Sequence, residues 1–183
     1  MDWLICRTCD FSDREYAAVY TQLSHSRKVH IDAFTNEGAR KCSLAGELLL
    51  RKLLAQKGIP SIPERAPSGQ PVLPDNAAFV SISHCDDWVV CAVSSTPVGI
   101  DIEKIRPVRQ GMAQRVCTPE ELAYVGQDMT RFFEIWTAKE AYFKMKGTGI
   151  TNFQAINILT LHRQVFRQED YLIQIVQEAC CGF

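Results

Sequence analysis

The chain has 183 residues, 46% of them hydrophobic and 22% charged, with a formal net charge of −1. This is the composition of a folded globular protein, and the length allows one substantial domain or two small lobes. A charge near zero gives no overall field that would favour nucleic acid or a membrane surface as a partner. Without a long apolar run or a signal peptide, we expect a cytoplasmic protein whose eight cysteines are reduced.

The first 60 residues predict a strand followed by two helices. Residues 3–7 are apolar enough for a strand, and Ser12 with Glu15 forms a capping box that opens a helix with an apolar stripe. A second helix is expected from about residue 36 to residue 57, because a glycine and then a proline follow it.

Two cysteines and two histidines in this region have the spacing of a C₂H₂ zinc site. Cys6 and Cys9 are separated by two residues, and His25 and His30 by four. The predicted strand contains Cys6, whereas His30 lies beyond the predicted helix in a polar stretch. The four side chains are not expected to converge, so we expect no zinc site here.

Basic side chains are concentrated between residues 27 and 65, where eight Lys or Arg residues stand against four acids. A solvated helix surface is the commoner explanation of such an excess, and a site for an anionic ligand is the alternative. The basic residues are Arg27, Lys28, Arg40, Lys41, Arg51, Lys52, Lys57 and Arg65.

The middle of the chain predicts a loop and then a hairpin. Residues 60–74 hold five prolines, which favours an irregular loop. Residues 78–83 and 88–94 are rich in strand-forming residues, and the polar residues 84–87 between them predict the turn.

The segment Val98–Glu103 predicts a strand with alternating side chains. Ile100 and Ile102 would point to one face of the sheet, and Asp101 and Glu103 to the other. Two neighbouring acids repel each other unless a cation lies between them. A hard divalent metal with oxygen ligands is the simplest such cation, so the pattern predicts a metal site that handles phosphate.

Two helices and two strands are expected after the acidic strand. Thr118, followed by a proline and two glutamates, supplies the start of one helix. A second helix holds residues 136–146 and places Glu140 and Lys144 one turn apart on the same face. The tail alternates again, which predicts two final strands, residues 155–161 and 171–176.

The polar, proline-containing segment at residues 95–97 is the best boundary in the chain. It divides an N-terminal lobe, residues 1–96, from a C-terminal lobe, residues 97–183, which carries the acids. Both lobes contain predicted strands and helices, so the expected fold class is α+β.

Three motifs in this order resemble the 4′-phosphopantetheinyl transferase superfamily, in particular its longer, monomeric surfactin-synthetase-activator type. The family carries a Gly-x-Asp-x-Glu strand followed by a Trp-x-x-Lys-Glu-Ala-x-x-Lys helix. These motifs stand here as Gly99–Glu103 and Trp136–Lys144. A third element, Ser-x-Ser-His, is present as Ser81–His84, and the likeness covers about residues 23–156.

The resemblance implies a pseudo-twofold fold of two similar α+β lobes in one chain, with the active site in the cleft between them. It implies a monomeric, cytoplasmic transferase that requires Mg²⁺. Such an enzyme moves 4′-phosphopantetheine from coenzyme A to a serine of an apo acyl or peptidyl carrier protein and releases adenosine 3′,5′-bisphosphate. Neither nucleic acid nor a membrane is implied as a partner.

By this resemblance, Asp101, Glu103 and Glu140 would hold Mg²⁺ against the pyrophosphate of coenzyme A. Glu140 would accept the proton of the carrier serine, directly or through a metal-bound water, and Lys144 would offset charge on the leaving phosphate. Without the resemblance, an exposed strand face and a surface pair of Glu140 with Lys144 would be the simpler interpretation.

The resemblance also assigns contacts to coenzyme A, although each of these side chains has a plain surface or turn position as its alternative. The assigned residues are Arg27, His30 and Ser43 at the 3′-phosphoadenosine, and Ser83, His84, Lys139 and Lys144 at the phosphates. The chain departs from the family at Gln70, where a Gly-Lys-Pro triplet usually supplies a lysine to a coenzyme A phosphate.

Two other functions remain open from the sequence. A Mg²⁺-dependent phosphohydrolase or nuclease would also use three acids and a lysine, but a nuclease should carry a basic groove, and here the excess is confined to residues 27–65. A degenerate relative that only binds coenzyme A or a carrier protein would be expected to lack one of the acids, and all three are present.

Overall fold

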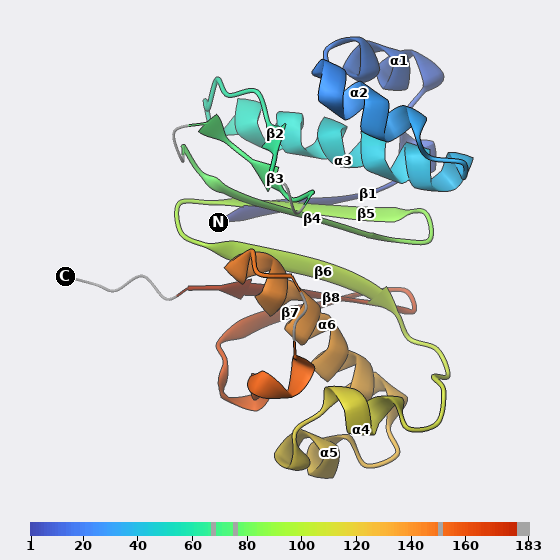
Figure 1. Cartoon of the computed structure of the whole chain (residues 1–183), viewed down its shortest axis with the longest axis vertical. Helices are drawn as coiled ribbons and strands as arrows, with labels where there is room; N and C mark the ends of the chain where they lie inside the picture. Colours follow the sequence, from blue (N-terminus) through green and yellow to red (C-terminus); the bar gives the residue numbers. More distant parts are fainter. Residues whose placement is uncertain (67–68, 75–76, 150–151, 179–183) are drawn as a thin grey trace, which may run out of the picture. The chain divides into compact units, whose positions relative to one another are not determined.

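The computed structural model describes residues 1–66, 69–74, 77–149 and 152–178 (Figure 1). The chain divides into two compact units, Met1–Ser95 and Thr96–Phe183. Each unit combines helices with antiparallel strands, so the protein is of the α+β class. Within the described ranges, no helix has both the length and the apolar character needed to cross a membrane.

The first unit contains a three-stranded antiparallel sheet with the strand order β1-β5-β4. These strands are β1 (Asp2–Arg7), β4 (Phe79–Cys85) and β5 (Trp88–Ser94), and every residue of the central β5 is buried. The predicted hairpin is confirmed, but its turn is shorter than expected. Asp86, with φ at +51°, carries the turn, since a short polar side chain tolerates the left-handed region.

The long helix α3 (Glu37–Gln56) packs on this sheet, and α1 (Asp13–Thr21) and α2 (His25–Asp32) pack on α3 (Figure 1). A short 3₁₀ turn, η1 (Thr8–Asp10), links β1 to α1. The two predicted helices are confirmed together with their capping signals. Leucines of α3 form the core with apolar residues of the sheet: Leu49, Leu50, Leu53, Leu54, Val89, Cys91 and Val93.

Helix α2 and the two short strands β2 (Glu64–Arg65) and β3 (Pro71–Val72) of this unit were not predicted. Helix α2 buries only Arg27 and Ile31, so its sequence has no apolar stripe to reveal it, and His30 lies on this helix rather than in an irregular stretch. The proline-rich loop was expected to lack regular structure. It contains a short antiparallel ladder, in which β2 pairs with β3.

The second unit contains a three-stranded antiparallel sheet with the order β6-β8-β7. The central strand β8 (Tyr171–Gln177) pairs with β6 (Val98–Lys104) on one side and β7 (Arg163–Gln168) on the other. Helix α6 (Met129–Lys146) packs on β6 and β8. Two shorter helices precede α6, namely α4 (Met112–Val116) and α5 (Pro119–Val125).

The predictions for the tail were half correct. The strand expected at 171–176 is confirmed as β8, but the strand expected at 155–161 is wrong. That region forms two 3₁₀ turns, η3 (Phe153–Ala155) and η4 (Ile158–Thr160). Asn157 caps the second turn by accepting a hydrogen bond from the Leu159 amide at 3.0 Å, so a local side-chain bond replaces a sheet ladder.

The six cysteines within the described ranges are all free: Cys6, Cys9, Cys42, Cys85, Cys91 and Cys117. Burial raises the pKa of the Cys6 thiol to about 12, which keeps it protonated at neutral pH. A protonated, buried thiol behaves as a small apolar side chain, which is the role expected for most of these residues. Cys180 and Cys181 lie outside the described residues.

Candidate functional site

Gly99 lets the main chain of β6 approach the main chain of α6 closely. A Cβ atom at this position would lie 1.8 Å from the carbonyl oxygen of Ala141, so no other residue fits without moving the helix. Side chains alternate along a strand, and the face that holds Gly99 therefore also holds Asp101 and Glu103. The alternating strand predicted from the sequence is confirmed, and it places both acids on the side of α6.

Lys144 bridges the helix to the first of these acids. Its Nζ donates to Oδ1 of Asp101 at 2.6 Å, and the Asp101 side chain is only 5% exposed. Lys144 thus lies inside the candidate site, where the sequence placed it. The surface-pair alternative does not describe this geometry, because the lysine reaches the buried acid of the strand.

Trp136 holds the second acid. Its Nε1 donates to Oε1 of Glu103 at 3.0 Å, and its ring stacks on Phe153 with the centroids 5.1 Å apart. Nothing in the sequence indicated this hydrogen bond. The indole therefore fixes one carboxylate oxygen of Glu103 while the ring itself is fixed by stacking.

The carboxyl groups in this cluster repel one another. Burial and then the charge of Asp101 raise the pKa of Glu140 to about 7, with Lys144 opposing the shift and Glu103 adding to it. The pKa of Glu103 is also raised, again by burial first and by Asp101 second. Each acid thus lies within the field of the others, and an added cation would relieve the repulsion.

The donor chemistry of these three residues fits a hard divalent metal, because carboxylate oxygens are the ligands that Mg²⁺ prefers. A cation among them would also reverse the raised pKa values of Glu103 and Glu140. Nevertheless, within the described ranges no set of three or more His, Cys, Asp or Glu side chains is arranged to hold a metal ion. The assignment of Asp101, Glu103 and Glu140 as metal ligands stays a prediction.

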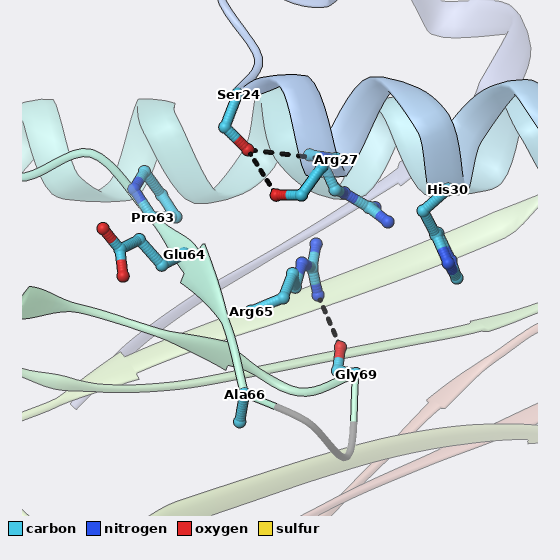
Figure 2. Close-up of a pocket in the computed structure, with 9 residues that line it drawn as sticks. Ser24, Arg27, His30, Pro63, Glu64, Arg65, Ala66 and Gly69 are labelled. Carbon is cyan, nitrogen blue, oxygen red and sulfur yellow. Dashed lines mark hydrogen bonds between the residues drawn. The ribbon is translucent and has the colours of Figure 1, made fainter.

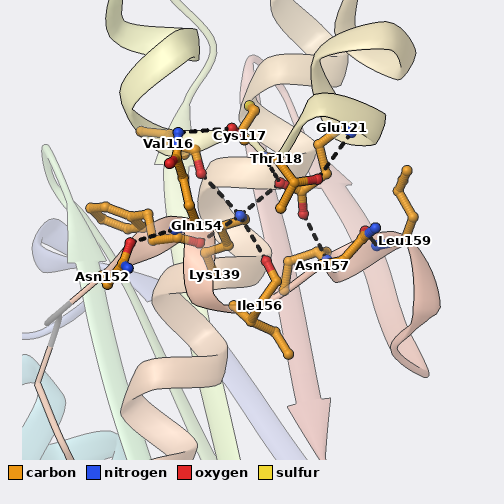
Figure 3. Close-up of polar contacts among 12 residues, drawn as sticks. Val116, Cys117, Thr118, Glu121, Lys139, Asn152, Gln154, Ile156, Asn157 and Leu159 are labelled. Carbon is orange, nitrogen blue, oxygen red and sulfur yellow. Dashed lines mark hydrogen bonds and ion pairs between the residues drawn. The ribbon is translucent and has the colours of Figure 1, made fainter.

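Lys139 does not lie where the sequence placed it. It was expected to contact a phosphate of coenzyme A, but its side chain is fully buried, with 0% exposure, and it forms an ion pair with Glu121 at 2.6 Å (Figure 3). Its Nζ also donates to three backbone carbonyl oxygens, those of Val116 at 2.9 Å, Phe153 at 2.6 Å and Ile156 at 2.9 Å. The ammonium group is surrounded by these four oxygen acceptors, so in this structure it is not accessible to a ligand.

The partner of Lys139 is equally well held. Glu121 accepts the backbone amide of Thr118 at 2.8 Å and that of Ile158 at 2.7 Å, and it is 0% exposed (Figure 3). These contacts join α6 to the start of α5 and to the two 3₁₀ turns. Lys139 and Glu121 therefore fix the helix that carries Glu140 and Lys144.

The first unit has a pocket of about 650 Å³ beside α2 and the proline-rich loop (Figure 2). The guanidinium groups of Arg27 and Arg65 point toward each other across it, and His30 lies further along α2. The lining residues are Ser24, Ser26, Arg27, His30, Pro63, Glu64, Arg65, Ala66 and Gly69. Two of the predicted coenzyme A residues, Arg27 and His30, are thus brought together.

A single buried acid holds both arginines of the pocket. Oε1 of Glu47 accepts from Nε of Arg27 at 2.9 Å and also from Nη2 of Arg65, and the Glu47 side chain is 3% exposed. Nη2 of Arg27 donates to Oγ of Ser43 at 2.6 Å. Ser43, which was also predicted to contact coenzyme A, therefore contacts Arg27.

Two further residues assigned to coenzyme A, Ser83 and His84, lie elsewhere in the same unit. Ser83 and His84 are strand residues of β4 rather than turn residues, Ser83 being buried and His84 exposed. Neither is among the described residues that line the pocket. Arg65 was not predicted as a site residue. The only feature of the sequence that could have indicated Arg65 as a site residue is the excess of basic residues at positions 27–65.

Residues 97–181 match the sequence profile of the 4′-phosphopantetheinyl transferase superfamily. The match covers just under half of the chain, and it shows that residues 97–181 are similar to this superfamily. The matched range contains the acids of β6 and the three lysines of α6, Lys139, Lys144 and Lys146. The pocket of the first unit lies outside it.

Several known transferases are similar to this chain. It is 39% identical over 119 residues to 4′-phosphopantetheinyl transferase gsp of Aneurinibacillus migulanus, covering 59% of this chain and 49% of that protein. It is 37% identical over 119 residues to 4′-phosphopantetheinyl transferase psf-1 of Bacillus pumilus, covering 60% of this chain and 51% of that protein. A 4′-phosphopantetheinyl transferase of Bacillus subtilis is 32% identical over 151 residues, covering 76% of this chain and 65% of that protein. The chain thus spans about half to two thirds of the length of these relatives.

Proposed function

We propose that this chain transfers 4′-phosphopantetheine from coenzyme A to a serine hydroxyl of an apo acyl or peptidyl carrier protein. The reaction would require Mg²⁺ and release adenosine 3′,5′-bisphosphate. The observation that carries the proposal is the cluster of Asp101, Glu103, Glu140 and Lys144 on β6 and α6, within the range that matches the superfamily. The relatives named as transferases support the same reaction.

In this proposal Asp101, Glu103 and Glu140 would hold the metal, which supplies positive charge against the pyrophosphate when it is bound. Trp136 keeps Glu103 oriented through the bond from its Nε1. Glu140 would accept the proton of the carrier serine, because its carboxyl group lies in the acid cluster beside Asp101 and Lys144.

As the serine oxygen bonds to the phosphorus of the phosphopantetheinyl group, the bond from that phosphorus to the bridging oxygen breaks. The leaving adenosine bisphosphate takes the electron pair. Lys144 would offset this negative charge, because its ammonium group already lies at the acid cluster, on Asp101.

The pocket of the first unit would hold the 3′-phosphoadenosine end of coenzyme A through Arg27 and His30, with Ser43 supporting Arg27. Ser83 and His84 on β4 remain candidates for the phosphates. We withdraw Lys139 from this set, because its ammonium group is enclosed by four acceptors.

The proposal includes two similar lobes, residues 1–96 and 97–183, with the active site in the cleft between them. Each unit contains a three-stranded antiparallel sheet with one long helix, α3 or α6, packed on it, which supports the idea of a repeated lobe. We also propose a cytoplasmic monomer, as the sequence suggested.

The test is incubation of the purified protein with coenzyme A, Mg²⁺ and a panel of apo carrier proteins, followed by intact mass measurement. The expected result is the addition of one phosphopantetheine to at least one carrier, abolished by EDTA and by replacing the carrier serine with alanine. Binding of coenzyme A without modification of any carrier would contradict the proposal and favour a protein that only binds.

A further inference from the structure

A buried carboxamide lies beside the first acid of the candidate site. Gln174 is the central residue of β8, and it is 0% exposed. The ladder between β6 and β8 places it directly opposite Asp101. Side chains that are opposite each other in an antiparallel pair lie on the same face, with their Cβ atoms about 5 Å apart. Gln174 therefore shares with Asp101 the face of the sheet on which α6 packs.

This carboxamide joins the sheet to the helix. Nε2 of Gln174 donates to the main-chain oxygen of Glu134, which lies six residues before Glu140 on α6. Glu134 lies inside the helix, where its carbonyl oxygen also accepts the amide four residues later in the regular helical pattern. The helix therefore does not need Gln174 to complete its own hydrogen bonds. The bond instead fixes where α6 lies on the sheet.

A carboxamide at this position has a cost to the folded state. Oε1 of Gln174 has no hydrogen-bond partner within the part of the chain that the structure describes. A buried polar atom without a partner destabilises the folded state, and leucine would pack here without that cost. Stability alone thus does not explain glutamine at this position. The other buried residues of β8 are aromatic or aliphatic: Tyr171, Leu172, Ile173, Ile175 and Val176.

We propose that Gln174 is a positioning residue of the acid cluster, and that its bond to α6 sets the separation of Asp101 and Glu140 that a divalent metal requires. This inference rests on the proposed function for the presence of the metal. Asp101 and Glu140 come from different elements, so their separation depends on how α6 lies on the sheet. Gly99 sets how closely the helix approaches β6, and Gln174 fixes its place along the sheet. Side chains that orient metal ligands without touching the metal typically change metal affinity ten-fold or more.

Titration of the metal-free protein with Mn²⁺ alone tests this inference, with the free ion counted by electron paramagnetic resonance. Gln174→Leu, which has a comparable size and no donor, should weaken Mn²⁺ binding by about ten-fold. The urea midpoint of the same metal-free variant should be unchanged or higher, because the variant removes the unpartnered oxygen and leaves every carbonyl of α6 with its helical partner. Gln177→Leu is the matched control and should bind Mn²⁺ as the wild type does. It removes a carboxamide from the other face of the same strand, where Nε2 donates to Thr96.

Unchanged Mn²⁺ affinity in Gln174→Leu would overturn the inference, and so would an equal loss of affinity in Gln177→Leu. Gln174→Met, which is unbranched like glutamine, guards against a poor fit of the leucine side chain. A lower urea midpoint in both Gln174→Leu and Gln174→Met would show that Gln174 acts on the whole fold, and would also overturn the inference. If only the leucine variant is destabilised, the methionine variant should show the ten-fold loss of Mn²⁺ affinity at a wild-type midpoint, and unchanged affinity would overturn the inference.

The outcome is separable from that of the proposed function. If the protein modifies a carrier but binds no Mn²⁺, or binds it equally well with and without Gln174, the inference fails and the function stands. If no carrier is modified but Mn²⁺ affinity depends on Gln174 and not on Gln177, the function fails and the inference stands.

Discussion

Lys139 and Glu140 are adjacent on α6, yet they lie in opposite electrostatic surroundings. The charge of Lys139 is balanced by Glu121, and its ammonium group also donates to three backbone carbonyls. Glu140 lies among acids of the same sign, and burial and Asp101 raise its pKa to about 7. One residue is electrostatically satisfied, while the other is held at a cost to the folded state.

The difference separates a structural pair from a functional group. A buried charge with all its partners contributes by fixing one arrangement of the elements around it. A cluster with unbalanced charge destabilises the protein alone and becomes favourable only with a ligand of opposite charge. Adjacent residues of a single motif can therefore have different roles, one structural and one functional. The spacing of the motif does not show which residue has which role.

The largest expected effect is on turnover. Glu140→Ala should lower transfer by about 10²–10⁴-fold, because it removes both a base and a ligand of the metal, and Asp101→Ala and Glu103→Ala should be similarly damaging. Steady-state rates with saturating Mg²⁺ measure this. Glu120→Ala, which removes an exposed acid of α5, should retain wild-type turnover. A Glu140→Ala protein with more than a tenth of the wild-type rate would show that Glu140 is neither base nor ligand.

The next effect is on stability. Lys139→Met should lower the free energy of unfolding by about 3–5 kcal/mol, because it leaves the buried Glu121 without its counter-charge. Urea unfolding measures the change. Lys146→Met removes an exposed pair with Glu178 and should cost less than about 1 kcal/mol.

The pairing itself can be checked with a double variant. Lys139→Met combined with Glu121→Gln should be less destabilised than the sum of the single variants, since the uncompensated charge is then gone. Strictly additive effects would mean that the two side chains stabilise the unit independently.

A smaller effect should depend on pH. In metal-free protein the pKa of Glu140 is about 7 when folded, above the ordinary glutamate value of 4.5, so the folded state binds more protons between these values. Stability should therefore fall as the pH rises from 4.5 to 7 and stay low above it. Glu140→Gln should gain about 1–2 kcal/mol over wild type at pH 8 and little at pH 4.5, after allowance for solvent screening. Urea unfolding in EDTA at both pH values measures it, and an equal gain at both would contradict the shift.

The smallest effect concerns Gln70. If Arg65 already supplies the cation of the pocket, Gln70→Lys should lower the Michaelis constant for coenzyme A by a few-fold at most, worth about 0.5–1.5 kcal/mol. The same substitution in an Arg65→Ala background should have a larger effect, because the added lysine then replaces a missing charge. Steady-state kinetics on the two pairs of proteins decide this, and equal effects in both backgrounds would show that positions 65 and 70 do not share a ligand.

Features that depend on neighbours in the sequence could be predicted. Ser12 and Thr118 both form the capping boxes that their sequences indicated, and the alternation of β6 placed Asp101 and Glu103 on one face. Helix α6 ends at Gly147, whose φ of +68° is the left-handed conformation that glycine adopts most easily.

Features that depend on distant partners could not be predicted. The burial of Lys139 follows from Glu121 and from three carbonyls in other elements, none of which a local pattern connects to it. Arg65 is directed into the pocket by a two-residue ladder within a proline-rich loop. Strand β7 is a largely polar edge strand, so it lacks the apolar alternation that revealed β6.

The contact at Gly99 has a consequence for anyone who engineers this protein. Because the main chain of β6 meets the main chain of α6 there, the distance from the acids on the strand to Glu140 and Lys144 is set by backbone against backbone. No side chain lies between them at that point to absorb a change in packing elsewhere in the unit. Core substitutions in Thr96–Phe183 that shift α6 on β6 should therefore also lower turnover. A screen of such substitutions for turnover alone would report whether α6 still packs correctly on the strand.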